Sequence, residues 1–164
     1  MIQCTDKCCN LLCKNFEGVV DERRDFLKYK KMKGGGILYD IDTNRVLIVQ
    51  SRAKLWGFPK GTIENNEEIE DCAMREIKEE TGINVSIDKN TKFLSENNKR
   101  CIYYILFHKV CNVFLQNGDI NNDATGIGWV DIKCLRKMLN NNIIRFNKQS
   151  LLIFNKFLNL QKMV

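Results

Sequence analysis

The sequence predicts one α/β domain in which helices cover both faces of a mixed β-sheet. The chain has 164 residues, which suits a single domain able to bury about two-thirds of its unfolded surface. Several short apolar runs have the length of buried strands, and two longer segments, one central and one terminal, repeat apolar residues at helical spacing. Strands mixed with two such helices in one domain are typical of a helix–sheet–helix sandwich.

Four apolar runs are predicted to be strands, because each has strand length and most are bounded by polar turn residues. The first two are joined by a short turn at 42–44, and the third follows a polar turn at 96–100. The fourth leads directly into a helix predicted at 132–139. In chain order, the predicted strands are 34–41, 45–51, 101–111 and 127–131.

The central helix is predicted to run from Glu67 to Thr81. Asn65 or Asn66 can cap its start, and Gly82 supplies a stop. One side of this helix is apolar and should pack inward, while the opposite side should be solvated. The predicted inward residues are Ile69, Ala73 and Ile77, and the predicted solvated ones are Asp71 and Lys78.

Three glutamates of this helix predict a metal site. At about 100° per residue, Glu76 and Glu80 fall within about 20° of Ile69, and Glu79 reaches the same region from the flank. Like charges on a packed side destabilise the protein unless something neutralises them. A hard divalent cation that takes carboxylate oxygens and substrate phosphates is the natural counter-charge, so Mg²⁺ or Mn²⁺ is predicted. The alternative for three glutamates alone is a solvated acidic helix.

The stretch from Gly61 to Ile83 fills every fixed position of the pattern G-x5-E-x7-R-E-U-x-E-E-x-G-U, where U is a bulky aliphatic residue. This stretch resembles the Nudix box, and Nudix domains have the α/β/α sandwich architecture predicted above. The resemblance implies that the Gly61 carbonyl group is a metal ligand and that Glu67 is a structural support. Arg75 lies four residues before Glu79 and can orient that carboxylate, so it is also interpreted as a support.

The residues before the box resemble the mRNA-decapping branch of the Nudix family, in the segment from Leu55 to Gly61. This resemblance implies hydrolysis of a diphosphate linkage in the 5′ cap, releasing 7-methylguanosine diphosphate. It also implies that Glu80 is the general base and that Glu76 and Glu79 chiefly hold metal. A lysine is common in the family at the position of Thr62, so this chain departs from the pattern there.

Substrate contacts are predicted from the same segment. Aromatic surface is expected from Trp56 and Phe58, and phosphate-binding charge from Arg52, Lys54 and Lys60. The alternative is that the aromatic rings belong to the core and the basic groups are solvated.

A further catalytic carboxylate is expected in the loop before Trp129. Asp123 best matches the glutamate of the decapping branch, and Asp119 is the nearby competitor. A turn-forming role for Asp123 is the alternative.

Residues 1–33 are predicted to be a Cys-rich and basic extension that precedes a Nudix domain at 34–164. The spacing of Cys4, Cys8, Cys9 and Cys13 matches no familiar zinc pattern, which leaves metal binding or a loose or helical extension. This segment is too short for the helical regulatory domain that precedes the Nudix fold in cellular decapping enzymes. Four later cysteines are expected to be reduced thiols in apolar surroundings, namely Cys72, Cys101, Cys111 and Cys134.

A last helix is predicted at 149–160, in a basic tail. The chain has a formal net charge of +6, and no acidic residue follows Asp131. The tail therefore favours a polyanionic ligand, although solvated lysines are the commoner explanation of any one of them. The expected seam of the helix is Leu152, Ile153, Phe157 and Leu160, with Lys156 at its edge.

The expected partner is capped RNA or another nucleoside or inositol polyphosphate. Diadenosine polyphosphate and diphosphoinositol polyphosphate hydrolases share the box, and a non-catalytic nucleotide- or RNA-binding Nudix module is the alternative from another class. No apolar run is long enough to span a bilayer and no signal peptide is evident, so an intracellular, cytoplasmic protein is expected.

Overall fold

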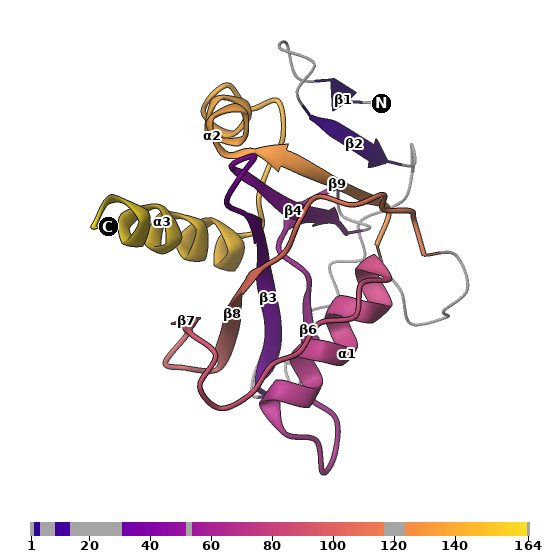
Figure 1. The fold of residues 1–164 in the computed structure, drawn as a ribbon, viewed down its shortest axis with the longest axis vertical. Helices are drawn as coiled ribbons and strands as arrows, with labels where there is room; N and C mark the ends of the chain where they lie inside the picture. The colour runs from indigo at the N-terminus through magenta and orange to yellow at the C-terminus, as the bar shows by residue number, and fades with distance from the viewer. Residues whose placement is uncertain (1, 4–8, 14–30, 52–53, 117–123, 164) are drawn as a thin grey trace.

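A computed structural model describes residues 2–3, 9–13, 31–51, 54–116 and 124–163 of the chain. Its described strands form one mixed sheet in the order β1-β2-β9-β4-β3-β8-β7 (Figure 1). The pairing of β3 with β8 is parallel, whereas its other neighbours pair in antiparallel fashion. In chain order, the strands are β1 Ile2–Gln3, β2 Asn10–Cys13, β3 Lys33–Asp40, β4 Arg45–Gln50, β5 Trp56–Gly57, β6 Lys60–Thr62, β7 Phe93–Glu96, β8 Cys101–Phe107 and β9 Gly126–Asp131.

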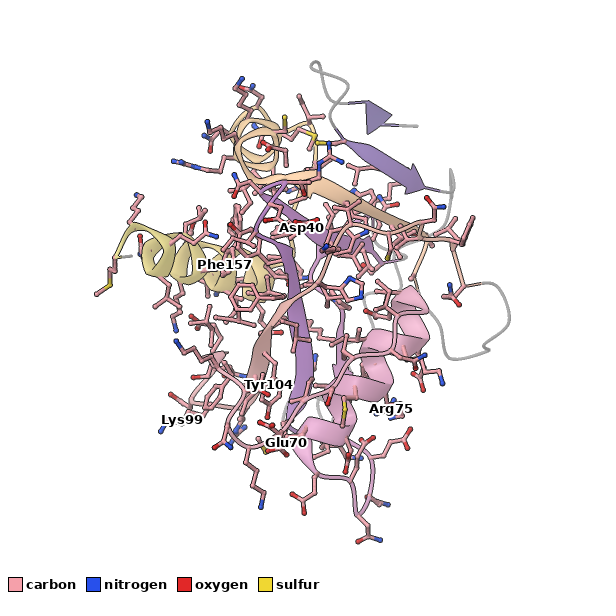
Figure 2. All side chains as sticks on the ribbon, viewed as in Figure 1. Asp40, Glu70, Arg75, Lys99, Tyr104 and Phe157 are labelled. Atoms are coloured by element: carbon pink, nitrogen blue, oxygen red, sulfur yellow. The ribbon has the colours of Figure 1, made fainter. Side chains whose placement is uncertain are left out.

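Helices cover both faces of this sheet, which confirms the predicted sandwich. Helix α1 (Ile69–Thr81) lies on one face, and α2 (Ile132–Asn140) and α3 (Lys148–Lys162) pack on the other. Successive strand residues point to opposite faces, so Ile37 belongs to the core under α2 and α3 while Leu38 belongs to the core under α1. Figure 2 shows Arg75 on the α1 side and Phe157 on the α3 side.

The predicted helix ends are confirmed in part. Helix α1 begins at Ile69, and its N-cap residue is Glu68 without a side-chain capping bond, so capping by Asn65 or Asn66 was wrong. It ends as predicted at Gly82, which adopts a left-handed φ of 75°. Ala73 and Ile77 are buried as predicted.

Helix α3 packs through a different seam from the predicted one. Ile153, Phe154 and Phe157 are buried, whereas Leu152 and Leu160 are 41% and 42% exposed, so the prediction was wrong for those two leucines. The observed seam is rotated by about one residue because Phe154 packs against the Phe58 and Phe146 rings in tilted arrangements, with centroid distances of 6.2 and 6.0 Å. None of the described helices combines the length and apolar character that crossing a bilayer requires.

Two other predictions need correction. The strand predicted at 101–111 ends at Phe107, and Cys111 is exposed, unlike the buried thiols of Cys72, Cys101 and Cys134. In the N-terminal segment, β2 pairs with β9, and Cys9 lies in the core. The described part of residues 1–33 is therefore neither loose nor helical, while the domain boundary at residue 34 stays a prediction. Cys4 and Cys8 lie outside the described residues, as does the side chain of Cys13.

Candidate active site

The site lies where β6 meets helix α1. Strand β6 pairs with the start of β3, so that Gly61 stands opposite Gly34. A Cβ atom placed on Gly61 would lie 1.9 Å from Cδ of Glu76. The carboxyl group of Glu76 therefore rests directly on the backbone of β6, and only glycine leaves room for it.

Arg75 connects the carboxylates of this region. Its Nε and Nη2 atoms donate to the two carboxylate oxygens of Glu67 at 2.7 and 3.1 Å. Its Nη1 atom donates to Oε1 of Glu76 at 2.7 Å and lies 3.3 Å from Oε2 of Glu79, so the predicted Arg75–Glu79 pair is present. Nη2 also donates to the carbonyl oxygen of Thr62 at 3.1 Å. One guanidinium group thus ties helix α1 to strand β6 and to the loop that contains Glu67.

Glu67 and Glu76 differ in their electrostatic environment. Hydrogen bonds from Arg75 lower the pKa of Glu67, and the same bonds raise the pKa of Arg75. Burial raises the pKa of Glu76, even though Arg75 opposes this change. Glu67 is therefore a stable anion that holds Arg75, while Glu76 is a carboxylate that would be stabilised by further positive charge.

Glu80 reaches β6 one helical turn after Glu76. Its Oε2 atom accepts a hydrogen bond from the backbone N–H of Lys60 at 3.1 Å. Glu76 and Glu80 thus meet consecutive residues of β6, and the side chain of Glu79, which is 29% exposed, lies beside them near Arg75. The three predicted glutamates share one side of α1 next to Gly61.

The residues fit a hard divalent cation that binds with help from its ligands. Carboxylates and a backbone carbonyl group are hard oxygen donors, and Mg²⁺ usually binds through one or two carboxylates together with waters and substrate phosphates. In the described part of the chain, no three His, Cys, Asp or Glu side chains gather closely enough to hold an ion by themselves. An ion at this site would complete its coordination with water and substrate phosphate oxygens.

The structure corrects the predicted aromatic surface. Trp56 and Phe58 are each only 1% exposed. Phe58 packs against Tyr103 and Phe146 with its ring centroid 6.4 and 5.7 Å from theirs. Both rings belong to the core beneath α3, so a substrate base cannot stack on them in this arrangement.

The predicted basic contacts lie in different settings. Lys54 is exposed and adopts a φ of 58°. The ammonium group of Lys60 donates a hydrogen bond to Oε1 of Gln149 and lies 5.9 Å from the centroid of the Tyr103 ring. Burial and the nearby Lys33 ammonium lower the pKa of Lys60 to about 8. Arg52, Asp119 and Asp123 lie outside the described residues.

Sequence reasoning missed two residues at the start of α3, Ser150 and the N-cap residue Asn147, that hold the segment before Gly61. Ser150 is fully buried, and its Oγ atom accepts a hydrogen bond from the backbone N–H of Phe58 at 3.1 Å. The N–H of Asn147 donates to the carbonyl oxygen of Trp56 at 2.9 Å. These contacts join residues about 90 positions apart in the sequence. The only local sign of them was Ser150, a polar residue on the apolar face of the helix.

Cys72 was predicted only to pack as an apolar thiol, but it also contacts the backbone of the site. Its Sγ atom donates to the carbonyl oxygen of Gly61 at 3.6 Å. Burial raises the pKa of Cys72 to about 12, so the thiol stays protonated and remains a donor. The thiol therefore helps to orient the carbonyl group that was predicted to be a metal ligand.

Comparison with known sequences finds a matching family and several relatives. Residues 33–149 match the sequence model of a family described as "NUDIX domain". An m7GpppN-mRNA hydrolase of Saccharomyces cerevisiae is 32% identical over 146 residues, which is 85% of this chain but only 15% of the yeast protein. A putative hydrolase, 111R, of Invertebrate iridescent virus 3 is 34% identical over 135 residues, or 81% of this chain and 78% of the viral one.

Comparison with solved structures supports the same fold. The NUDIX domain of Shewanella oneidensis NrtR, solved with ADP ribose, superposes with a TM-score of 0.59 at 15% identity. The match covers 82% of this chain and 88% of that domain. At such low identity, the likeness concerns the arrangement of helices and strands.

Proposed function

The chain belongs to the NUDIX domain family, and from that premise we propose that it is a metal-dependent pyrophosphohydrolase whose substrate is the 5′ cap of RNA. The observation that carries the proposal is the placement of Glu76 and Glu80 on consecutive residues of β6, with Arg75 fixed beside them. A family member that had lost catalysis would be expected to lose these carboxylates. Here all three glutamates of the predicted site are present.

The chain's own residues would each have a distinct role. Glu76, Glu79, Glu80 and the carbonyl group of Gly61 would hold Mg²⁺ or Mn²⁺, which when bound neutralises phosphate charge and lowers the pKa of a water molecule. Glu80 would accept the proton of the attacking water, because the backbone N–H of Lys60 already orients this carboxylate through its Oε2 atom. Arg75 and Glu67 would keep Glu76 and Glu79 in place.

Two kinds of observation favour capped RNA over small substrates. The relatives of yeast and of Caenorhabditis elegans that match most of this chain are named m7GpppN-mRNA hydrolases. In addition, a hollow of about 330 Å³ between α2 and α3 is lined by two cations, Arg136 and Lys162, and by three asparagine carboxamides beside apolar side chains. Such a surface suits the phosphates and base edges of an RNA strand. Lys156 is not among the residues that line it, and its ammonium group pairs with Glu96 at 2.7 Å.

We further place this activity in a reducing compartment, as expected for the cytoplasm. The described cysteines, Cys9, Cys72, Cys101, Cys111 and Cys134, form no disulfide, which is the usual state of cysteines in such a compartment.

The test is product analysis on RNA with a labelled 7-methylguanosine cap, in the presence of Mg²⁺ or Mn²⁺. We expect release of 7-methylguanosine diphosphate by the wild type and loss of this product in Glu80→Gln, which keeps the side-chain size. Diadenosine polyphosphate and an inositol pyrophosphate serve as parallel substrates. Inert capped RNA together with rapid cleavage of either small substrate would reject the decapping function, and inactivity on all three would favour a binding module.

A further inference from the structure

Two lysines lie together on the face of the sheet opposite the glutamates. Lys33 shares its face of β3 with Ile37 and Tyr39, which belong to the core under α2 and α3. In the antiparallel register, Gly35 stands opposite Lys60, so the side chain of Lys60 lies on that same face. Its ammonium group reaches Gln149 at the start of α3, in agreement with this placement.

The two cations are close enough to repel each other. Lys33 stands opposite Thr62 and Lys60 stands opposite Gly35, so the two lysines are diagonal neighbours on one face of the sheet. None of the ion pairs found among the described residues includes Lys33 or Lys60, and the Glu80 carboxylate meets the backbone N–H of Lys60 rather than its ammonium group. A half-buried pair of like charges destabilises the fold unless an anion joins it.

The ammonium group of Lys60 contacts two uncharged side chains. Gln149 offers one neutral oxygen, and the Tyr103 ring lies 5.9 Å from the ammonium group. Cys101 is the parallel partner of Lys33 on β8, and its thiol is buried beside the two lysines. Since an ammonium group has three N–H donors, Lys60 can still donate to an incoming anion.

We propose that Lys33 and Lys60 form an anion subsite for a phosphate group of the substrate, and that Gln149 of α3 is the positioning residue that holds Lys60 in it. The inference rests on the proposed function, because the anion would belong to the same substrate. Strand β6 separates the subsite from the metal site by the thickness of one backbone: the N–H of Lys60 meets Glu80 and its side chain meets Gln149. A substrate that wraps around β6 can therefore place one phosphate on each side.

The subsite can be tested without metal or nucleotide, by calorimetric titration of the metal-free full chain with inorganic pyrophosphate at pH 7 and low salt. We expect Lys33→Met and Lys60→Met each to weaken binding about ten-fold to hundred-fold, the size typical of a hydrogen bond to a charged group. Lys33→Arg should keep most of the affinity. Lys89→Met, which removes an exposed lysine of the turn before β7, is the matched control and should bind like the wild type.

The role of Gln149 needs a measurement that a purely structural role would not affect. Gln149→Glu places a carboxylate against Lys60, so pyrophosphate affinity should fall as far as in Lys60→Met while the melting temperature stays the same or rises. Gln149→Leu removes the acceptor without adding charge, and we expect a loss of only a few-fold. A residue that merely packs would lower the melting temperature and affect affinity equally in both variants.

The outcomes separate this inference from the proposed function. Absence of pyrophosphate binding by the wild type, or equal affinity in Lys33→Met and Lys89→Met, overturns the subsite. If pyrophosphate binds as expected but capped RNA and the small substrates stay intact, the proposed function fails and the subsite stands. If capped RNA is cleaved equally well by wild type and Lys33→Met, with equal KM, the subsite plays no part in that reaction and the inference is rejected as stated.

Discussion

The carboxyl group of Glu76 occupies the space in which a side chain at position 61 would begin. A Cβ atom on Gly61 would lie 1.9 Å from Cδ and 2.1 Å from both carboxylate oxygens of Glu76. Real carbon atoms never approach this closely, so any residue other than glycine must displace either Glu76 or strand β6. The glycine that opens the box is therefore a condition for the position of one glutamate.

Gly61→Ala should abolish most of the activity while the protein still folds. The methyl group must push Glu76 away from β6, and a displacement of about 1 Å in a catalytic constellation can reduce rates about 100-fold. Steady-state hydrolysis and thermal unfolding would be measured together.

Gly82→Ala is the matched control for this prediction. Gly82 has a left-handed φ of 75°, so alanine there introduces backbone strain of about 1–2 kcal/mol without entering the site. We expect a lower melting temperature and a smaller loss of kcat than in Gly61→Ala. Equal kcat values in the two variants would contradict the steric account of Gly61.

Arg75→Lys should be poorly tolerated although it keeps the charge. Arginine holds Glu67 through two parallel hydrogen bonds and reaches Glu76 and Thr62 with its remaining donors, whereas a lysine ammonium group cannot make this planar set. We expect a loss of about 1–3 kcal/mol in the free energy of unfolding, measured in urea, and at least ten-fold weaker Mn²⁺ binding. Lys78→Arg, on the exposed side of the same helix, should leave both values unchanged.

Acid should destabilise the protein partly through Glu67. Because Arg75 lowers the pKa of Glu67 in the folded state, this carboxylate contributes stability at any pH above its unfolded value of about 4.3. That contribution is lost as the pH falls through the lower folded pKa. Glu67→Gln should therefore reduce the free energy of unfolding at pH 7 and flatten its decline below pH ~4. If the free energy of unfolding of the variant falls as steeply as that of the wild type below pH ~4, Glu67 is not responsible.

Helix α1 could be predicted from the sequence because the signals that define it are local. The spacing of Ala73, Ile77 and the glutamates along one chain segment determines which residues share a side, and Gly82 marks the end. The burial of Trp56 and Phe58 could not be predicted in this way. It depends on Ser150 and Phe154, about 90 residues later, which cover these rings only after α3 has packed on the sheet. The same reason explains why Gln149 was missed as the partner of Lys60.

Ser150→Ala should show how strongly helix α3 holds the segment that enters the site. The Oγ atom of Ser150 is the acceptor for the backbone N–H of Phe58 at 3.1 Å, in a fully buried position. Alanine would leave that N–H without this partner, which typically lowers the free energy of unfolding by about 1–3 kcal/mol. Because Phe58 is followed by Pro59, Lys60 and Gly61, we also expect kcat to fall several-fold. Ser86→Ala, at an exposed position, is the control in both chemical denaturation and steady-state assays. A Ser150→Ala protein with wild-type stability and kcat would mean that α3 covers the segment without positioning it.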